Sequence, residues 1–297
     1  MDDIPKIAIV GAGRWGKKLI NEYKKYGKIA AICHSGSTDT NRWLKENIPE
    51  APVQILEEII QDKTIAGTIV ATPPNAHRDI TVRLLEGGKD VCVEKPAGMN
   101  TEDIQAMIDA SEKNKKILMV GYEFVYHPVW QWIIKTFKEK GEKITHVSTE
   151  WLKWGSFMIP LEDNLLCHDI SLIQDVFSEP IQCMRLNCIG AVSPSDIGNY
   201  IFKIDDTMIG SSHINRCSPL KHKIVSVIGK NGTMFVWVDE TLYHKNGDQL
   251  TEIDINGNAL KQEYEAFISA IRTRISPQTD ANFAKRVRET ISKIKDL

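Results

Sequence analysis

The sequence lacks an excess of charge of either sign and lacks any long apolar run. Its 37 lysine and arginine residues nearly balance 39 aspartate and glutamate residues, which leaves a formal net charge of −2. Such a balance argues against a nucleic-acid-binding surface and against a basic patch for membrane lipids. No stretch approaches the ~18 consecutive apolar residues that a membrane span requires. We therefore expect neither a nucleic acid nor a membrane as a partner.

Paired cysteine motifs are missing as well. The six cysteines are scattered, without a Cys-x-x-Cys motif or the spacing of a zinc site, and no metal is expected. Several lie in apolar, strand-like segments, which favours buried, reduced thiols. Because the acidic start Met1–Pro5 leads directly into an apolar strand, we expect a cytoplasmic protein. The cysteines are Cys33, Cys92, Cys167, Cys183, Cys188 and Cys217.

What the sequence does have is a glycine-rich turn. The spacing Gly-x-Gly-x-x-Gly follows an apolar segment at 6–10, helical periodicity continues to residue 23, and 29–33 is apolar again. In such a unit the first glycine allows a tight turn, the second lets the backbone approach a pyrophosphate, and the third lets helix and strand pack closely. The alternative is a glycine turn without a ligand. A dinucleotide site is predicted at Gly11, Gly13, Arg14, Trp15 and Gly16.

Strand-like and helix-like segments alternate as far as residue 122. This alternation predicts a doubly wound parallel sheet, forming a Rossmann domain over residues 1–122. Asn75, and Asn100 or Thr101, stand where they would cap two of the helices. Beyond the first βαβ unit, the expected strands are 66–71, 90–93 and 117–120, and the expected helices are 76–86 and 101–115.

After residue 122, strands follow one another without intervening helices. This predicts an α+β domain over residues 123–297 with a mostly antiparallel, open sheet. One face of this sheet is expected to lack helices, and Met234–Val238 has apolar residues pointing to both faces. We therefore expect a homodimer or homotetramer assembled through that sheet. The expected strands are 144–151, 182–189, 200–204, 208–213, 223–228, 233–238 and 242–245, and the expected helices are 128–140, 168–177, 260–274 and 280–295.

Further motifs lie where a doubly wound domain places its ligand, at the carboxyl ends of strands. A proline-rich loop follows one strand and a Glu-Lys-Pro triplet ends the next, while Asn164 and His168 open a helix of the second domain. The residues expected to contact the cofactor here are Thr72, Pro73, Asn75, His77, Glu94, Lys95 and Pro96.

Together these motifs resemble the Gfo/Idh/MocA family of NAD(P)-dependent oxidoreductases over nearly the whole chain. The resemblance implies that Lys95, joined to Pro96 by a cis peptide, hydrogen-bonds the substrate oxygen that alternates between alcohol and carbonyl. It implies that His168 carries the proton. Asn164 replaces the usual aspartate and can hydrogen-bond a hydroxyl or orient His168, with Asp163 as a second candidate. The alternatives are a surface lysine and a structural histidine.

The region around the expected substrate departs from the family pattern at Val125 and within Ile159–Asp163. Nearby aromatic side chains are candidates for stacking on a sugar ring, although a place in the core is an equally open interpretation. The candidate substrate contacts are Tyr122, Tyr126, Trp154 and Asp163, with Trp151 as a further aromatic candidate.

The end of the second strand bears on which dinucleotide is bound. An acidic residue there would hold a ribose 2′-hydroxyl and repel a 2′-phosphate, but the chain has His34, followed by Ser35, Ser37 and Arg42. Hydroxyl donors and a guanidinium suit a 2′-phosphate. NADP is therefore the preferred cofactor, and NAD stays open because Asp39 is close by in the sequence.

We expect an enzyme that transfers a hydride reversibly between a nicotinamide and a secondary alcohol or ketone of a sugar, sugar phosphate or nucleotide sugar. The alternatives are an NADPH-dependent reductase of an imine or conjugated bond, and a dinucleotide sensor without turnover. The presence of both Lys95 and His168 argues against the sensor.

Overall fold

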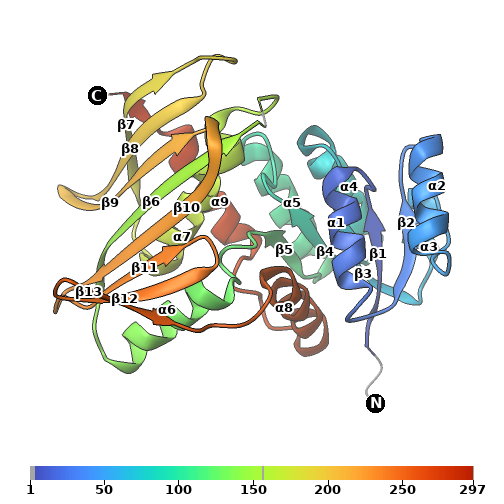
Figure 1. The fold of residues 1–297 in the computed structure, drawn as a ribbon. Helices are drawn as coiled ribbons and strands as arrows, with labels where there is room; N and C mark the ends of the chain where they lie inside the picture. The colour runs from blue at the N-terminus through green and yellow to red at the C-terminus, as the bar shows by residue number, and fades with distance from the viewer. Residues whose placement is uncertain (1–3, 156, 297) are drawn as a thin grey trace. The chain divides into compact units, whose positions relative to one another are not determined.

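The computed structural model describes residues 4–155 and 157–296, which form two compact units (Figure 1). The first unit contains the described residues up to 123 together with the segment 259–285. The second contains 124–258 and the described residues from 286 onward. The sequence suggested a single boundary after residue 122, whereas in the structure the chain returns to the first unit near its end.

The returning segment packs both on the helix that contains Tyr23 and on the sheet of the first unit. The helix α8 (Ala259–Thr273) places the ring of Tyr264 4.9 Å from the ring of Tyr23. A Cβ added to Gly67 would lie 2.7 Å from the side chain of Ile271. The helix therefore lies directly against the sheet and covers apolar residues that would otherwise be exposed.

The first unit is built on a five-stranded sheet. Its strands are β1 (Lys6–Val10), β2 (Ile29–Cys33), β3 (Ile65–Val70), β4 (Asp90–Glu94) and β5 (Leu118–Gly121). They are ordered β2-β1-β3-β4-β5 and pair in parallel throughout, so the predicted Rossmann architecture is confirmed. The strand order changes direction between β1 and β3. Sheets of this kind bind ligands at the carboxyl ends of the strands next to that change.

The helices of this unit include two that the sequence pattern did not predict, α2 and α3. They are α1 (Arg14–Tyr23), α2 (Thr38–Asn47), α3 (Leu56–Gln61), the 3₁₀ turn η1 (Pro74–Ala76), α4 (His77–Glu86) and α5 (Thr101–Asn114), besides α8. The helix α2 buries only Leu44. A single buried residue does not form the row of core-facing apolar positions from which a helix is predicted.

The two predicted helix caps have different outcomes. At the start of α5, the side chain of Asn100 accepts a hydrogen bond from the backbone N–H of Asp103 at 2.7 Å, which confirms that cap. The cap at Asn75 is wrong. That residue lies inside η1, and α4 begins at His77 without a side-chain cap, because the 3₁₀ turn already leads into the helix.

The second unit contains a nine-stranded sheet. Its strands are β6 (Ile144–Trp154), β7 (Gln182–Ile189), β8 (Ile197–Ile204), β9 (Thr207–Asn215), β10 (Cys217–Gly229), β11 (Met234–Val238), β12 (Thr241–Asn246), β13 (Gln249–Ile253) and β14 (Lys295–Asp296). Their order is β13-β12-β11-β10-β6-β9-β8-β7-β14. Only β6–β9 and β7–β14 pair in parallel among the described residues, so the predicted, mostly antiparallel α+β architecture is confirmed. The strand β13 was not predicted, because its side chains are largely exposed on both faces.

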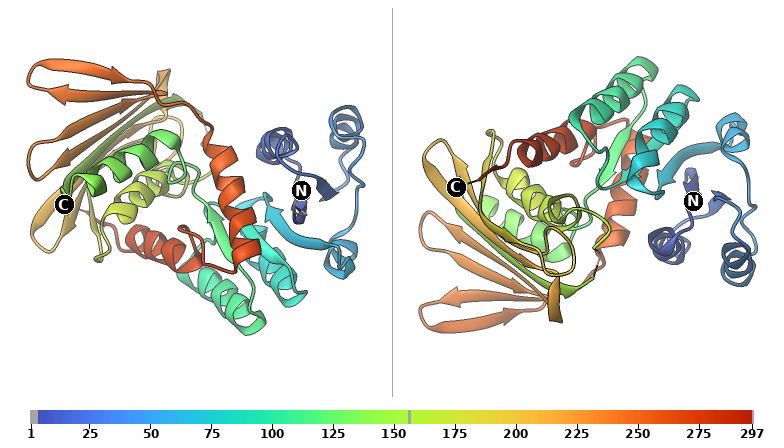
Figure 2. Two further views of the ribbon diagram at one scale, coloured as in Figure 1. Left: turned by 90° about the horizontal axis from the view of Figure 1, so that it is seen from below. Right: turned by 90° about the horizontal axis from the view of Figure 1, so that it is seen from above.

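Helices cover one face of this sheet (Figure 2). The helical segments are α6 (Pro128–Glu139), the π-helical turn η2 (Glu162–Leu166), α7 (Cys167–Val176) and the C-terminal part of α9 (Ala281–Ser292). The ring of Phe137 in α6 packs edge-on against Phe235 of β11, with centroids 5.6 Å apart. Along β10 the alternation places Val225 and Val227 in the interior, while Ile224 stays half-buried on the other face.

Candidate functional site

The three glycines of the turn between β1 and α1 meet different surroundings. Gly11 has φ +109°, and a Cβ added there would lie 2.5 Å from the backbone of Ala71. A Cβ on Gly16 would lie 2.1 Å from the carbonyl oxygen of Gly11. A Cβ on Gly13 would meet nothing within 4 Å. The fold itself therefore requires Gly11 and Gly16, while Gly13 faces the open space in which the motif accepts a pyrophosphate.

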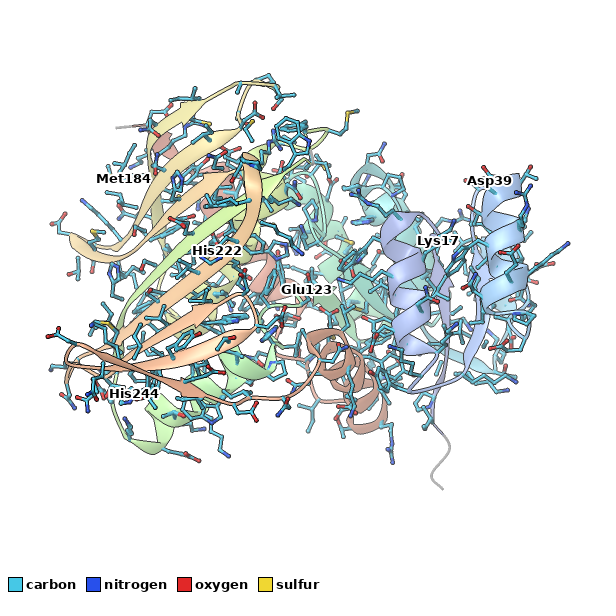
Figure 3. All side chains as sticks on the ribbon, in the orientation of Figure 1. Lys17, Asp39, Glu123, Met184, His222 and His244 are labelled. Carbon is cyan, nitrogen blue, oxygen red and sulfur yellow. The ribbon has the colours of Figure 1, made fainter. Side chains whose placement is uncertain are left out.

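The start of α1 fits a bound dinucleotide phosphate. The helix has ten residues and no acidic side chain in its first turn, so the positive end of its dipole is not neutralised there. Arg14 is exposed and Trp15 half-buried. One turn on, the ammonium of Lys17 lies over the ring of Trp43 in α2, 5.2 Å from its centroid. Figure 3 labels Lys17 on α1 and Asp39 on α2.

The loop after β2 holds the residues predicted to choose between the two dinucleotides. His34 accepts a hydrogen bond at Nδ1 from the backbone N–H of Gly36 at 3.1 Å, so its Nε2 donates to Asn41 at 3.0 Å. The imidazole is thus held by its own loop. The side chains of Ser35, Ser37 and Arg42 are exposed beside it.

His77 joins the two loops that the sequence assigned to the cofactor. Its buried ring lies 2.8 Å through Nδ1 from the carbonyl oxygen of Pro96 and 2.8 Å through Nε2 from that of Thr72. Burial lowers the pKa of His77, although both carbonyls oppose that shift. The ring braces one loop against the other. Of the remaining loop residues, Pro73 and Asn75 are exposed.

The Glu-Lys-Pro triplet ends β4. The peptide between Lys95 and Pro96 is cis, as the resemblance implied, and the Lys95 side chain is half-buried. Burial raises the pKa of Glu94 to about 7, and the negative charge of Glu123 acts in the same direction. Close by, the buried carboxylate of Glu263 accepts a hydrogen bond from a tyrosine hydroxyl.

In the second unit His168 lies in the first turn of α7 and is 6% exposed. Its ring is stacked on the indole of Trp151, with centroids 5.7 Å apart and 18° between the planes. Phe124 meets the imidazole edge-on at 4.9 Å and the indole at 5.1 Å. The imidazole is therefore held against two aromatic side chains from different elements.

Two residues beside His168 in the sequence lie in η2. The Asp163 carboxylate is buried and forms an ion pair with Arg288 of α9. Asn164 is half-buried, and its backbone N–H donates to the carbonyl of Pro160 at 3.0 Å. The Asp163 charge is thus compensated by Arg288 within the protein.

The candidate aromatic contacts differ in exposure. Tyr122 is 3% exposed and meets Phe283 edge-on, while Tyr126 is 5% exposed. Trp154 is 64% exposed at the end of β6 and touches Phe157. The two tyrosines match the core interpretation that the sequence left open, and Trp154 remains available to a ligand.

Sequence reasoning missed two buried, charged side chains that lie beside the aromatic rings around His168. Asp169 is 0% exposed and Lys223 is 7% exposed. The Lys223 ammonium lies 3.6 Å from the ring centroid of Phe124 and 3.2 Å from that of Trp237. The sequence did contain a signal for the burial of Lys223. This residue lies two positions before Val225 in a strand, so both side chains point to the same, inward face.

A second buried charge pair holds the loop before η2. The Asp196 carboxylate accepts hydrogen bonds from the backbone N–H groups of 191–193 and from Arg216. Arg216 also donates to the carbonyl of Ile159 at 2.6 Å. Through this arginine, two loops that are distant in the sequence are fixed to each other.

The described residues contain neither a metal-binding cluster nor a membrane-spanning helix. Within 4–155 and 157–296, no group of three or more histidine, cysteine, aspartate or glutamate side chains is placed to hold a metal ion. No described helix is both long enough and apolar enough to cross a membrane.

Comparison with known proteins gives matches at the level of sequence and of fold. A family model described as an oxidoreductase family with an NAD-binding Rossmann fold, Gfo/Idh/MocA, matches residues 5–122. Myo-inositol 2-dehydrogenase of Thermotoga maritima is 27% identical over 119 residues, 39% of this chain and 36% of that protein. The chain spans about a third of the length of the first curated relatives it matches.

Two further matches extend over nearly the whole chain. The 4-carboxy-2-hydroxymuconate-6-semialdehyde dehydrogenase of a Sphingobium species is 22% identical over 293 residues, 92% of each chain. The solved structure of UDP-N-acetylglucosamine 3-dehydrogenase from Acidithiobacillus ferrooxidans has a TM-score of 0.86 at 17% identity, covering 97% of this chain and 96% of that one. At that identity, the structural match shows a shared fold.

The glycine turn and the parallel sheet define a dinucleotide-binding Rossmann unit, which in this chain is followed by an α+β unit. Residues 5–122 match the Gfo/Idh/MocA family, which is described as an oxidoreductase family with an NAD-binding Rossmann fold. Over these residues, the resemblance that the sequence predicted is confirmed.

Proposed function

We propose that the protein is an enzyme that transfers a hydride reversibly between a nicotinamide dinucleotide and a secondary alcohol or ketone of a small polyhydroxylated molecule. The observation that carries the proposal is the glycine turn, in which Gly11 and Gly16 are packed against backbone while Gly13 faces open space. The names of the relatives supply the substrate class, because they include dehydrogenases of an inositol and of a nucleotide sugar.

Lys95 and His168 are the two candidate catalytic groups. A bound nicotinamide would supply or accept the hydride. Lys95, a half-buried residue directly after β4, would donate a hydrogen bond to the substrate oxygen and stabilise negative charge that develops on it. His168 would take the hydroxyl proton in oxidation and return it in reduction, with Asn164 as a hydrogen-bonding partner of the hydroxyl.

NADP is the proposed preference. The exposed Ser35, Ser37 and Arg42 follow β2, and Lys17 of α1 adds a second positive charge close to α2. Two cations and two hydroxyls suit a 2′-phosphate. The acidic Asp39 is the residue that would favour NAD instead.

The experiment begins with fluorescence titration of the protein with NADPH and with NADH, followed by turnover on a panel of polyols, sugars and their ketones. We expect NADPH to bind at least ten-fold more tightly, about 1.4 kcal/mol. Binding of neither dinucleotide would refute the proposal. Lys95→Ala and His168→Ala should each lower kcat by about 10²–10⁴-fold while both variants still bind dinucleotide. Full activity of His168→Ala would show that the proton is carried by another group.

We also propose that the sheet face opposite the helices is the contact between copies of the chain. Across its central strands this face carries small or apolar side chains, among them Ser148, Ile201, Ser211, Ile224 and Ser226, together with the polar Glu150, Asn199 and His213. Such a face is suited to packing against an identical one. Light scattering at micromolar concentration should give the mass of a dimer or tetramer, and the mass of a monomer would refute this contact.

A further inference from the structure

The aromatic surface under His168 is itself held by a buried carboxylate. The indole N–H of Trp151 donates to Oδ1 of Asp169 at 2.7 Å, and the hydroxyl of Ser212 donates to Oδ2 at 2.6 Å. The carboxylate belongs to α7, the indole to β6 and the hydroxyl to β9. Asp169 thus connects the helix that carries His168 to two neighbouring strands.

We propose that Asp169 is a positioning residue: by holding the indole of Trp151, it fixes the surface on which the ring of His168 lies. The inference rests on the proposed function, in which His168 transfers the proton. Asp169 acts through Trp151, because its two carboxylate oxygens point to the indole and to Ser212.

The position of the indole is decisive because a ring stacked on another ring follows its movements. Trp151 and His168 are nearly parallel at 18°, and Phe124 closes the edge of both rings. A hydrogen bond from the indole N–H to a buried oxygen restrains rotation of the ring, whether the oxygen belongs to a carboxylate or to an amide. Displacement of a catalytic group by about 1 Å lowers turnover by about 100-fold.

The surrounding charges keep Asp169 able to accept both hydrogen bonds. Burial raises its pKa to about 6, while the bonds from Ser212 and Trp151 and the positive charge of Lys223 lower it. Lys223 lies over the rings of Phe124 and Trp151 at 3.6 and 5.5 Å. At neutral pH the carboxylate is therefore mostly ionised and shares the interior with an opposite charge.

The test compares three substitutions. Asp169→Ala removes both acceptors. In Asp169→Asn the amide oxygen can accept from Trp151 while the amide nitrogen donates to the Ser212 hydroxyl, so the geometry survives without the charge. Ser212→Ala is the matched control, because it removes one partner of the same carboxylate and leaves the indole held. All three are measured for kcat, KM, dinucleotide affinity and the ring proton signals of His168 in a histidine-labelled NMR spectrum.

We expect Asp169→Ala to lower kcat by about 10-fold to 100-fold without weakening dinucleotide binding, and to move the His168 ring signals. Asp169→Asn should restore kcat and the signals, and Ser212→Ala should change neither. A kcat for Asp169→Asn as low as for Asp169→Ala would show that charge matters rather than position. Unchanged His168 signals in Asp169→Ala would equally overturn the inference.

Two provisions keep the test decisive. If Asp169→Ala does not fold, Trp151→Phe keeps an aromatic ring but removes the N–H donor. It should then reproduce the loss of kcat and the moved signals, and wild-type behaviour of that variant would overturn the inference. The ring signals need no substrate. A wild-type protein without turnover would refute the proposed function, whereas the signals of His168 test the positioning role by themselves.

Discussion

Replacing Glu94 with glutamine should make the first unit more stable at alkaline pH. Glu94 is 8% exposed, and burial raises its pKa to about 7, with repulsion from Glu123 adding to the shift. Burial also raises the pKa of Glu263 well above its usual value, and the Glu94 charge contributes. Both pKa values are shifted upward, so protonation of either carboxyl favours the folded state.

The magnitude and the sign follow from proton linkage. The Glu94 carboxyl has a pKa of 4.5 without the fold and about 7 within it. Because folding raises this pKa, the stabilisation is complete below the unfolded pKa and is lost as the pH rises through the folded one. At about 1.4 kcal/mol per pKa unit, the loss is about 3 kcal/mol. Most of this stabilisation is lost between pH 5 and pH 8. A glutamine at position 94 does not titrate, so the Glu94→Gln variant does not undergo this loss.

The assay is urea unfolding at pH 5 and pH 8 without added dinucleotide. The free energy of unfolding of Glu94→Gln, relative to wild type, should rise by most of about 3 kcal/mol between the two pH values. The control is Glu265→Gln, an exposed position on α8 next to the buried Glu263, which should follow the wild type. Parallel pH curves for wild type and Glu94→Gln would refute the reasoning.

Three further substitutions test other parts of the structure. Arg216→Met leaves the Asp196 carboxylate, 0% exposed, without its cation and should destabilise the second unit by about 3–5 kcal/mol in urea unfolding; a loss under about 1 kcal/mol, as for a surface pair, would contradict this. Gly13→Ala should leave thermal unfolding unchanged but weaken NADPH binding by ten-fold or more, about 1.4 kcal/mol. Gly16→Ala is the opposite case, since its Cβ would lie 2.1 Å from the Gly11 oxygen and should lower the melting temperature. Unaltered NADPH affinity of Gly13→Ala would count against a pyrophosphate at this turn.

The parallel sheet was predictable because both of its signals are local. Apolar segments and intervening helices alternate along the chain, and the glycine spacing marks the first turn directly. The place of α8 was not predictable, because its apolar stripe shows that one face is buried but not against which sheet. The strand β13 and the helix α2 escaped detection because each buries too little for a period to appear.

For the candidate site, sequence reasoning identified motifs but not the contacts between distant residues. Lys95, His168 and the glycines were named from local spacing. Asp169 precedes apolar helix positions and Lys223 lies in an apolar strand, and only the tertiary structure shows that both border the aromatic rings beside His168. Charges buried together leave no fixed spacing in a sequence, because their separation depends on the whole fold.

The return of residues 259–285 to the first unit has a consequence for how the protein is made. During synthesis the five strands of the parallel sheet emerge first, but α8 follows only after β6 to β13, eight of the nine strands of the second sheet, have been translated. Until then the Gly67 surface and the ring of Tyr23 lack their covering helix. A fragment ending at residue 122 would keep that apolar surface exposed, so the nucleotide-binding unit cannot be isolated as one continuous stretch of the chain.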